Sequence, residues 1–380
     1  MKRSALRGEQ GILPMRVGFD AAPLIQPTSG VGWHTYHLLK GLLDLKESTE
    51  FVGYIPPGVT PSEEQVRWAQ PGQLRWVNSG RMGQWWRGRT DGLDLYHGPN
   101  FKMPTQGRRG GIVTIHDLWL DRFPEFSKKL LGQGPSFLRT KRTAWQARCV
   151  ITVSRHAAND IQELYGLPEE RIVVIPNGVS DEFYPEVDSK PSHPIRGDLQ
   201  FPTPRYILFV GGASPRKNNV ALLHAYAQCS VIRDTHCLVG VGNPKDRYVD
   251  LHQVAQRLGI ADRLVCVGPV SVSELRQLYS AADLFVFPSL YEGFGIPVIE
   301  AMACGTPVIS ANTSSLPEVV GDAAILVGPR DYGEIAEAIK QLIDNSTLRK
   351  NLVSKGYDRV KKYTWRETAR LTFELYRQLC

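Results

Sequence analysis

The segment PSLYEGFGIPVIEAMACGTPVI, residues 288–309, combines two carboxylates with glycines just before a predicted helix. Gly293 and Gly295 have no side chain, so backbone amide groups there can approach a ligand closely. The start of the helix offers unpaired N–H groups and a partial positive charge, which suit a diphosphate. Glu292 in the loop could then bind sugar hydroxyls, and Glu300 in the helix could bind a ribose diol. Two surface carboxylates around a turn are the alternative, and the length of the surrounding pattern favours a binding site.

Two adjacent cations, Arg216 and Lys217, occur in the segment LFVGGASPRKNNVALLHAY, residues 208–226. They follow a predicted strand and a glycine-rich turn that includes Gly211, and they precede a predicted helix. Their charges could neutralise a pyrophosphate and the negative charge that develops on it as it leaves. A solvated basic turn is the alternative interpretation.

His116 and Asp117 follow a predicted buried strand, Ile112–Ile115, in the other half of the chain from Glu292. The imidazole could hydrogen-bond a sugar hydroxyl or a departing phosphate, and the carboxylate could orient an acceptor hydroxyl. A lone His-Asp pair is more often structural. Its place at the carboxyl end of a strand favours a functional role, because ligands of open parallel sheets bind there.

A short glycine motif, Gly30-Val31-Gly32, lies between the first predicted strand and a predicted helix, Trp33–Leu43. A dinucleotide-binding fingerprint would need a third glycine and an acidic residue at the end of the next strand, and both are missing here. The pattern therefore argues against a dehydrogenase. It predicts a loop whose backbone comes close to a phosphate or an acceptor.

Taken in order, these motifs resemble the signature of glycosyltransferase family 4, a large retaining family with the GT-B fold. The resemblance covers about residues 15–365. It implies that Glu292 contacts the donor sugar and that Glu300 contacts the ribose. His116 matches a histidine that contacts the donor sugar in the family, and Gly32 belongs to a segment similar to the family's N-terminal glycine loop.

The cation pair is similar to the Pro-Arg-Lys-Asn form of the family's phosphate site. The chain departs from a common variant, in which an arginine directly follows the first glycine of the turn, because it has Gly212 there. The cationic role is therefore assigned to Arg216 and Lys217. The expected catalytic residues are His116, Glu292, Lys217 and Arg216. The expected donor-binding residues come from the two glycine turns, the cation pair and the glutamate segment: Gly32, Gly211, Arg216, Lys217, Glu292, Gly293, Phe294, Gly295, Ile296 and Glu300.

Acceptor contacts are expected from Asp117 and from Ser154, which could equally cap a helix. The segment SGRMGQWWRGRT, residues 79–90, mixes Trp85 and Trp86 with arginines. Tryptophan and arginine together suit an anionic lipid interface, and they equally suit a nucleic acid or a protein partner. Tryptophans that pack inward are the alternative.

The elements that must position these residues are predicted strands that alternate with helices, which is the pattern of parallel β-α-β units. Strands are expected at Arg16–Phe19, Phe51–Ile55, Leu74–Val77, Leu93–Tyr96, Ile112–Ile115, Cys149–Val153, Ile172–Ile175, Tyr206–Val210, Thr235–Val239, Leu264–Val267, Leu284–Phe287 and Pro307–Ser310. Helices in the second half are expected at Asn219–Ala227, Val249–Leu258, Ser273–Ala281, from Pro297 to Met302, and near 333–344 and 346–361.

The fold class is therefore α/β, and the resemblance specifies the GT-B fold, with two Rossmann-like domains that face each other across a cleft. Residues 185–205 hold five prolines and little apolar periodicity, which predicts a linker. The expected order is a disordered extension (1–14), an N-terminal acceptor-binding domain (15–185), a linker (186–205), a C-terminal nucleotide-sugar-binding domain (206–361) and a C-terminal helix (362–380) that packs back on the N-terminal domain.

Composition limits the class of protein. The chain has 380 residues, of which 42% are hydrophobic and 22% charged, so two globular domains are expected. The net charge of +7 favours polyanionic partners such as a nucleoside diphosphate or anionic lipid. No apolar stretch is long enough to span a membrane, and the six cysteines are interpreted as reduced core thiols. These features predict a cytoplasmic protein, with peripheral contact at the inner face of the membrane as an option.

The expected reaction transfers a hexose from a nucleoside diphosphate sugar to a saccharide or a lipid-linked saccharide, with retention of the anomeric configuration, in cell-surface polysaccharide synthesis. The similarity to bacterial polysaccharide mannosyltransferases suggests GDP-mannose as the donor. No cofactor is expected, and no metal, because no Asp-x-Asp pair is present to chelate Mg²⁺. A nucleotide-sugar epimerase of GT-B shape and a non-catalytic nucleotide-sugar-binding protein are the alternatives. Nucleic acid binding would rest on charge alone and is not expected.

Overall fold

The computed structural model describes residues 14–25, 30–59, 74–79, 83, 90–126, 136–186 and 201–380. The chain divides into two compact units. The first comprises Met1–Ile115, Leu138–Ile151 and Ala369–Cys380. The second comprises His116–Phe137 and Thr152–Thr368. Residues 1–13 of the proposed extension, most of the proposed linker, and Trp85 and Trp86 lie outside the described residues.

A seven-stranded sheet has the order β3-β2-β1-β4-β5-β6-β7. Its first strand, β1, pairs in parallel with both β2 and β4. Strand β1 is therefore an inner strand, with later strands of the chain on both sides of it. Its middle strands are almost wholly buried, as short apolar runs of this kind predict for a parallel sheet. The strands are β1 (Met15–Asp20), β2 (Thr49–Ile55), β3 (Leu74–Asn78), β4 (Leu95–Gly98), β5 (Gly111–Ile115), β6 (Cys149–Thr152) and β7 (Ile172–Val174).

A six-stranded sheet has the order β10-β9-β8-β11-β12-β13. Numbered within this sheet, the order is 3-2-1-4-5-6, which is that of a Rossmann fold, and the strands pair in parallel. The order reverses between β8 and β11, and ligands of such sheets bind beyond the carboxyl ends of the strands at this point. The strands are β8 (Arg205–Val210), β9 (His236–Val241), β10 (Leu264–Gly268), β11 (Leu284–Phe287), β12 (Val308–Ala311) and β13 (Ala324–Val327).

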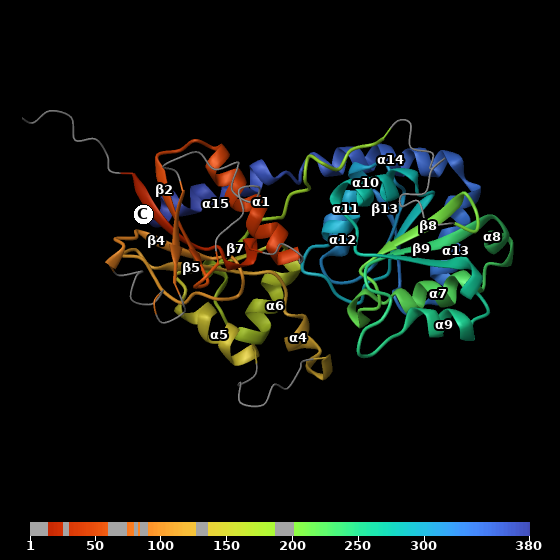
Figure 1. The fold of residues 1–380 in the computed structure, drawn as a ribbon, viewed down its shortest axis with the longest axis horizontal. Helices are drawn as coiled ribbons and strands as arrows, with labels where there is room; N and C mark the ends of the chain where they lie inside the picture. The colour runs from red at the N-terminus through yellow and green to blue at the C-terminus, as the bar shows by residue number, and fades with distance from the viewer. Residues whose placement is uncertain are drawn as a thin grey trace, which may run out of the picture. The chain divides into compact units, whose positions relative to one another are not determined.

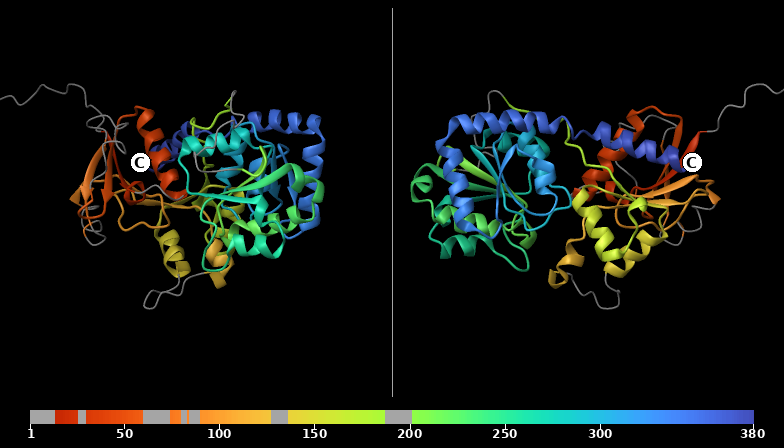
Figure 2. Two further views of the ribbon diagram at one scale, coloured as in Figure 1. Left: turned by 45° about the vertical axis from the view of Figure 1, so that its right-hand side comes forward. Right: turned by 180° about the vertical axis from the view of Figure 1, so that it is seen from behind.

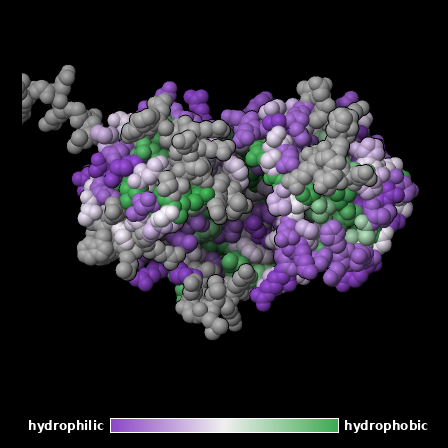
Figure 3. Space-filling model, viewed as in Figure 1, coloured by the Kyte–Doolittle hydropathy of each residue, from purple (hydrophilic) through white to green (hydrophobic). Residues whose placement is uncertain are grey.

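Helices cover both faces of the second sheet (Figures 1 and 2). Alternate residues of β8 enter two separate cores: Tyr206 and Leu208 belong to one, and Ile207 and Phe209 to the other. This alternation follows from the two-residue period of a strand, and it makes every side chain in the middle of β8 apolar. On the face that Figure 3 shows, hydrophilic residues surround smaller hydrophobic areas on the second unit.

The main helices are α1 (Gly30–Asp44), α4 (Trp119–Arg122), α5 (Ser136–Gln146), α6 (Arg155–Tyr165), α7 (Asn219–Ala227), α8 (Ser230–Thr235), α9 (Leu251–Arg257), α10 (Val272–Ala281), α11 (Ile296–Ala303), α12 (Leu316–Val320), α13 (Tyr332–Asp344), α14 (Ser346–Val360) and α15 (Trp365–Leu379). Short 3-10 helices include η4 (Pro215–Lys217).

Two expectations about the first unit are wrong. The glycine motif is not a loop before a helix, because α1 already begins at Gly30 and includes Gly32. Strand β4 runs two residues later than the expected Leu93–Tyr96 and includes His97. This polar residue can lie inside a buried strand because its ring nitrogens are hydrogen-bonded, Nδ1 to Tyr376 Oη at 2.6 Å and Nε2 to Thr114 Oγ1 at 2.8 Å.

The cysteines form no disulfide among the described residues, and four of the six are buried. Cys266 is partly buried. The expectation of a core thiol is wrong for Cys380, which is exposed at the end of α15.

Candidate functional site

The turn after β8 holds Lys217 against the backbone. Gly211 and Gly212 have φ angles of 108° and 57°, which favour glycine. A Cβ on Gly211 would lie 2.6 Å from Cγ of Lys217, and one on Gly212 would lie 2.2 Å from the carbonyl oxygen of Asn243. The glycines therefore let the aliphatic part of Lys217 lie across the end of the strand.

Asn218 ties this turn to two other loops. It takes the left-handed conformation, with φ at 54°, between η4 and α7. Its side-chain amide donates to the carbonyl of Pro288 at 3.0 Å and to that of Pro329 at 2.6 Å. The backbone N–H of Leu290 donates to the carbonyl of Arg216 at 2.8 Å. The cation pair and the loop after β11 are therefore fixed together by hydrogen bonds.

The carboxylate of Glu292 is buried and paired with both cations. Lys217 Nζ donates to Oε1 at 2.8 Å, and Arg216 Nη1 lies 3.3 Å from Oε2. The backbone N–H of Glu292 donates to the hydroxyl of Ser314 at 2.8 Å. Lys217 Nζ also lies 4.6 Å from the centre of the Phe287 ring, a cation–π contact. The sequence motifs after β8 and β11 thus meet where the strand order reverses.

The pKa shifts of Glu292 and Arg216 favour their charged forms, whereas the shift of Lys217 opposes its charge. Burial alone would raise the pKa of the Glu292 carboxyl, but the charges of Arg216 and Lys217 and the hydrogen bond from Lys217 hold it below its usual value. Burial, together with the charge of Arg216, lowers the pKa of Lys217, and Glu292 opposes this effect. The charge of Glu292 raises the pKa of Arg216. Each charge is therefore stabilised mainly by its partner.

The backbone after Glu292 is packed too tightly for side chains at its glycines. A Cβ on Gly293 would lie 1.9 Å from the carbonyl oxygen of His116. Gly295 has a φ of 99° and precedes Ile296, the first residue of α11. The hydroxyl of Ser315 donates to the carbonyls of Glu292 at 2.9 Å and Phe294 at 3.0 Å. The loop therefore presents a fixed backbone at the start of a helix, which is the geometry that suits an anion.

Glu300 is placed on α11 and accepts a hydrogen bond from the hydroxyl of Tyr279 at 3.1 Å. Burial raises the pKa of the Glu300 carboxyl to about 7, although the hydrogen bond from Tyr279 and the charge of Lys217 act in the opposite direction. This carboxyl therefore titrates close to neutral pH.

Known protein families and individual proteins are similar to this chain. The family model for group 1 glycosyl transferases matches residues 193–359, and the model for Glycosyltransferase Family 4 matches residues 28–183. The O-antigen chain mannosyltransferase RfbU of Salmonella typhimurium is 31% identical over 260 residues, which cover 67% of this chain and 68% of the relative. The chain therefore belongs to glycosyltransferase family 4.

Other relatives of this glycosyltransferase match over nearly its full length. The O-antigen chain mannosyltransferase B of Escherichia coli is 29% identical over 392 residues, covering 96% of this chain and 100% of the relative. A solved structure of sucrose-phosphate synthase from Thermosynechococcus elongatus has a TM-score of 0.74 at 22% identity and covers 96% of this chain and 99% of that one. Anabaena HepE, solved with UDP and glucose, has a TM-score of 0.73 at 20% identity, with coverage of 96% and 99%. The two units have the GT-B fold that was expected.

In this glycosyltransferase, Asp117 and His116 also lie next to residues of the Arg216–Lys217 and Glu292 segments. Oδ2 of Asp117 lies 3.4 Å from Nη1 of Arg216, and its Oδ1 accepts from the backbone N–H of Trp119 at 3.1 Å. His116 is buried, and its carbonyl packs against Gly293. Both residues belong to the second unit, with Glu292 and Lys217.

A buried hydrogen-bond network surrounds Tyr291 and Asp160, and no sequence motif predicted it. The Tyr291 hydroxyl donates to Oδ2 of Asp160 and accepts from the backbone N–H of Leu118 at 3.2 Å. Arg122 Nη2 donates to Oδ1 of Asp160 at 2.6 Å. This network joins the residues after His116–Asp117 to the residue before Glu292. Its one signal in the sequence was the place of Tyr291 beside Glu292.

Two of the expected site residues have other places in the structure. Ser154 caps α6: its hydroxyl accepts from the backbone N–H of Ala157 at 3.1 Å, and the carboxylate of Glu318 accepts from Arg155 N and His156 N. Gly32 lies in α1, which belongs to the first unit, whereas Lys217 and Glu292 belong to the second.

Among the described residues, no three His, Cys, Asp or Glu side chains gather as a metal site would require. In the same part of the chain, every helix is too short or too polar to cross a membrane.

Proposed function

We propose that this glycosyltransferase transfers mannose from GDP-mannose to a saccharide or a lipid-linked saccharide in the synthesis of a cell-surface polysaccharide, with retention of configuration. The observation that carries the proposal is the pairing of Lys217 and Arg216 with Glu292 at the strand-order reversal. The choice of mannose is supported by the relatives named mannosyltransferases, one of them aligned over nearly the whole chain. The acceptor class is supported by two relatives that are named for the O-antigen chain.

In the proposed reaction, the acceptor oxygen forms a bond to the anomeric carbon on the face that the diphosphate leaves. The bond from that carbon to the diphosphate oxygen breaks, and a phosphate oxygen of the leaving group takes the acceptor's proton. Lys217 and Arg216, with the N–H groups at the start of α11, stabilise the negative charge on the leaving group. No side chain acts as a covalent nucleophile.

The remaining residues bind and orient the donor in this proposal. Glu292 accepts hydrogen bonds from the sugar hydroxyls, and its carboxylate keeps Lys217 in place before the donor arrives. Glu300 accepts from the ribose diol. His116 braces the sugar, and Asp117 orients the acceptor hydroxyl. The reaction needs no metal ion. The protein works in the cytoplasm, at the inner face of the membrane when its acceptor is lipid-linked.

A ligand screen followed by a transfer assay tests the proposal. GDP-mannose should raise the melting temperature of the protein more than UDP-glucose or ADP-glucose at equal concentration, because only a ligand bound to the folded state stabilises it. With α-1,3-mannobiose added, the first product should carry an α-linked mannose, read by proton NMR. A β-linked product would contradict retention. A new sugar nucleotide formed from donor alone would indicate the epimerase, and binding without turnover of any acceptor would indicate a sensor.

A further inference from the structure

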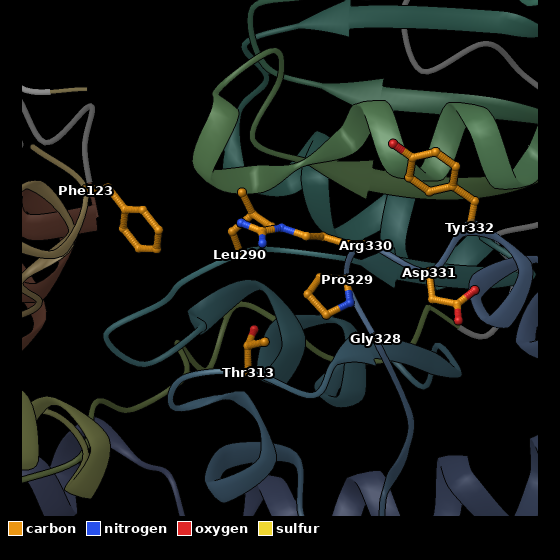
Figure 4. A pocket seen from close by; sticks show the side chains of 8 residues that line it. All are labelled: Phe123, Leu290, Thr313, Gly328, Pro329, Arg330, Asp331 and Tyr332. Carbon is orange, nitrogen blue, oxygen red and sulfur yellow. The ribbon is translucent and has the colours of Figure 1, made fainter. Parts of the chain in front are cut away.

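A cavity of about 640 Å³ lies at the carboxyl end of β11, β12 and β13, next to the donor-binding residues. Leu290 follows β11, Thr313 follows β12, and the turn from Gly328 to Tyr332 joins β13 to α13. None of the residues that line this cavity is among those predicted to contact the donor. Figure 4 shows the side chains that the inference uses: Leu290, Thr313, Pro329, Arg330, Asp331 and Tyr332.

The wall of this cavity is fixed to the phosphate-binding turn. Asn218 donates to the carbonyl of Pro329 at 2.6 Å, and it is the residue directly after Lys217. The turn is closed on itself, because Glu334 N donates to Asp331 Oδ1 at 2.9 Å and Gly328 N donates to Glu334 Oε2 at 2.6 Å. A ligand that binds here meets a preformed surface and need not order a loop.

Arg330 supplies unused hydrogen-bonding capacity. Its side chain is exposed, and within the described part of the chain it makes no hydrogen bond and no ion pair. In Figure 4 it extends beside Pro329 toward Leu290. The neighbouring arginine of the donor site, Arg216, is by contrast paired with Glu292 and Asp117.

The mixture of lining groups matches a pyranose ring. Such a ring has apolar C–H faces and equatorial or axial hydroxyls at its rim. Leu290, Pro329 and the ring of Tyr332, which is stacked on His224 at 4.7 Å, offer apolar surface. The planar guanidinium of Arg330 donates to pairs of hydroxyls, and the carboxylate of Asp331 accepts from them. The lining contains one arginine and one carboxylate, so the cavity lacks the excess positive charge that a second phosphate would need.

We propose that this cavity is a saccharide subsite that holds a sugar unit of the acceptor beside the donor site. The inference rests on the proposed function for the identity of the reaction. It adds the acceptor residues Arg330 and Asp331, which lie in the half of the chain that was expected to bind the donor alone. The backbone bond from Leu290 N to the Arg216 carbonyl joins the subsite to the phosphate turn.

Arg330→Ala and Asp331→Asn test the subsite, and the second change keeps the helix cap of α13 because asparagine also caps. The control is Arg257→Ala, which removes another exposed arginine, on α9. With GDP-mannose and α-1,3-mannobiose, Arg330→Ala should raise the acceptor KM about tenfold, as expected for the loss of charge-assisted hydrogen bonds. The donor KM should change by less than about twofold. A raised donor KM, or an unchanged acceptor KM, would overturn the proposal.

A binding measurement tests the subsite independently of the transfer reaction. Saturation-transfer NMR of α-1,3-mannobiose with the full chain and GDP should give signals for the wild type and for Arg257→Ala, and weaker ones for Arg330→Ala. Equal signals in all three proteins, or none in the wild type, would overturn the subsite. If the disaccharide binds through Arg330 but no nucleotide sugar is turned over, the proposed function fails while the subsite stands.

Discussion

Lys217 and Glu292, 75 residues apart in the chain, form an ion pair with Nζ 2.8 Å from Oε1. The pair exists because β8 and β11 are neighbours in the sheet, although two strands lie between them in sequence. Both side chains are largely buried, with 13% and 6% of their surface exposed. The two residues therefore contribute to stability as well as to the proposed reaction.

Lys217→Ala should reduce kcat by about 100- to 1,000-fold, because a group that stabilises the leaving diphosphate is lost. It should also lower the free energy of unfolding, by up to about 3–5 kcal/mol, since the buried carboxylate of Glu292 keeps only Arg216 as a cationic partner. The double variant Lys217→Met/Glu292→Gln should recover part of this stability and none of the activity. Urea unfolding and steady-state kinetics on the same preparations measure both effects. Near-normal turnover by Lys217→Ala would refute the phosphate assignment.

Glu300 should make donor binding depend on pH around 7. Its raised pKa means that the protonated form is favoured in the folded, donor-free protein. The stability that this gives is complete below the unfolded pKa of about 4.3 and is lost as the pH rises through about 7. The ribose diol would favour the ionised carboxylate, so GDP should bind more tightly above pH 7 than below it. Binding at pH 7 should release a proton.

Calorimetry of GDP binding in two buffers with different ionisation enthalpies measures that proton. Glu300→Gln should bind GDP more weakly and release none. A wild-type protein whose GDP affinity is flat between pH 6 and pH 8 would show that Glu300 does not contact the ribose.

Gly293→Ala should destabilise the site by about 1–3 kcal/mol, because the new methyl group meets the carbonyl oxygen of His116. The control is Gly30→Ala at the start of α1, where an added Cβ meets no atom within 4 Å. The first variant should melt at a lower temperature and turn over more slowly, and the second should match the wild type. Equal melting of both variants would argue that the His116 segment does not pack against Gly293 in solution.

Tyr291→Phe should lower kcat while leaving the donor KM nearly unchanged. The change removes the acceptor for Leu118 N and the donor to Asp160, at a cost of about 1–3 kcal/mol in unfolding free energy. We expect the His116–Asp117 segment to lose its fixed position beside Glu292. Tyr357→Phe, at an exposed tyrosine elsewhere in the second unit, serves as the control. A fall in stability without any fall in kcat would assign Tyr291 a structural role only.

Transfer should survive treatment with EDTA, because the proposed reaction balances the leaving charge with Arg216, Lys217 and the start of α11. The initial rate after chelation and gel filtration should match the untreated rate. A loss of activity that Mg²⁺ restores would refute metal independence.

The sequence predicted the parts of the site but could not predict their contacts. The motifs at Arg216–Lys217 and Glu292 were found because each follows an apolar run that reads as a buried strand. That these two runs are neighbours depends on the strand order, which no local pattern specifies. The predicted loop at Gly32 was wrong because glycine is also tolerated at the first turn of a helix, and there the helix extends through it.

Asp160 was missed for a different reason. It lies in the middle of α6, and its sequence neighbours give no sign that Arg122 and Tyr291 surround it. Burial of a carboxylate is decided by partners far along the chain. The burial of His97 likewise depends on a distant partner, because the hydrogen-bonded Tyr376 lies 279 residues away in the chain.

The carboxylates of Glu292 and Asp117 pair with Arg216 and Lys217, so the two positive and two negative charges of this cluster balance each other. In the proposed donor site, a free phosphate must therefore compete with these carboxylates for the two cations. A sugar nucleotide brings both a diphosphate for Lys217 and Arg216 and hydroxyls for Glu292. Under the proposed roles, the ion pair should therefore favour ligands in which sugar and phosphate are joined over simple anions.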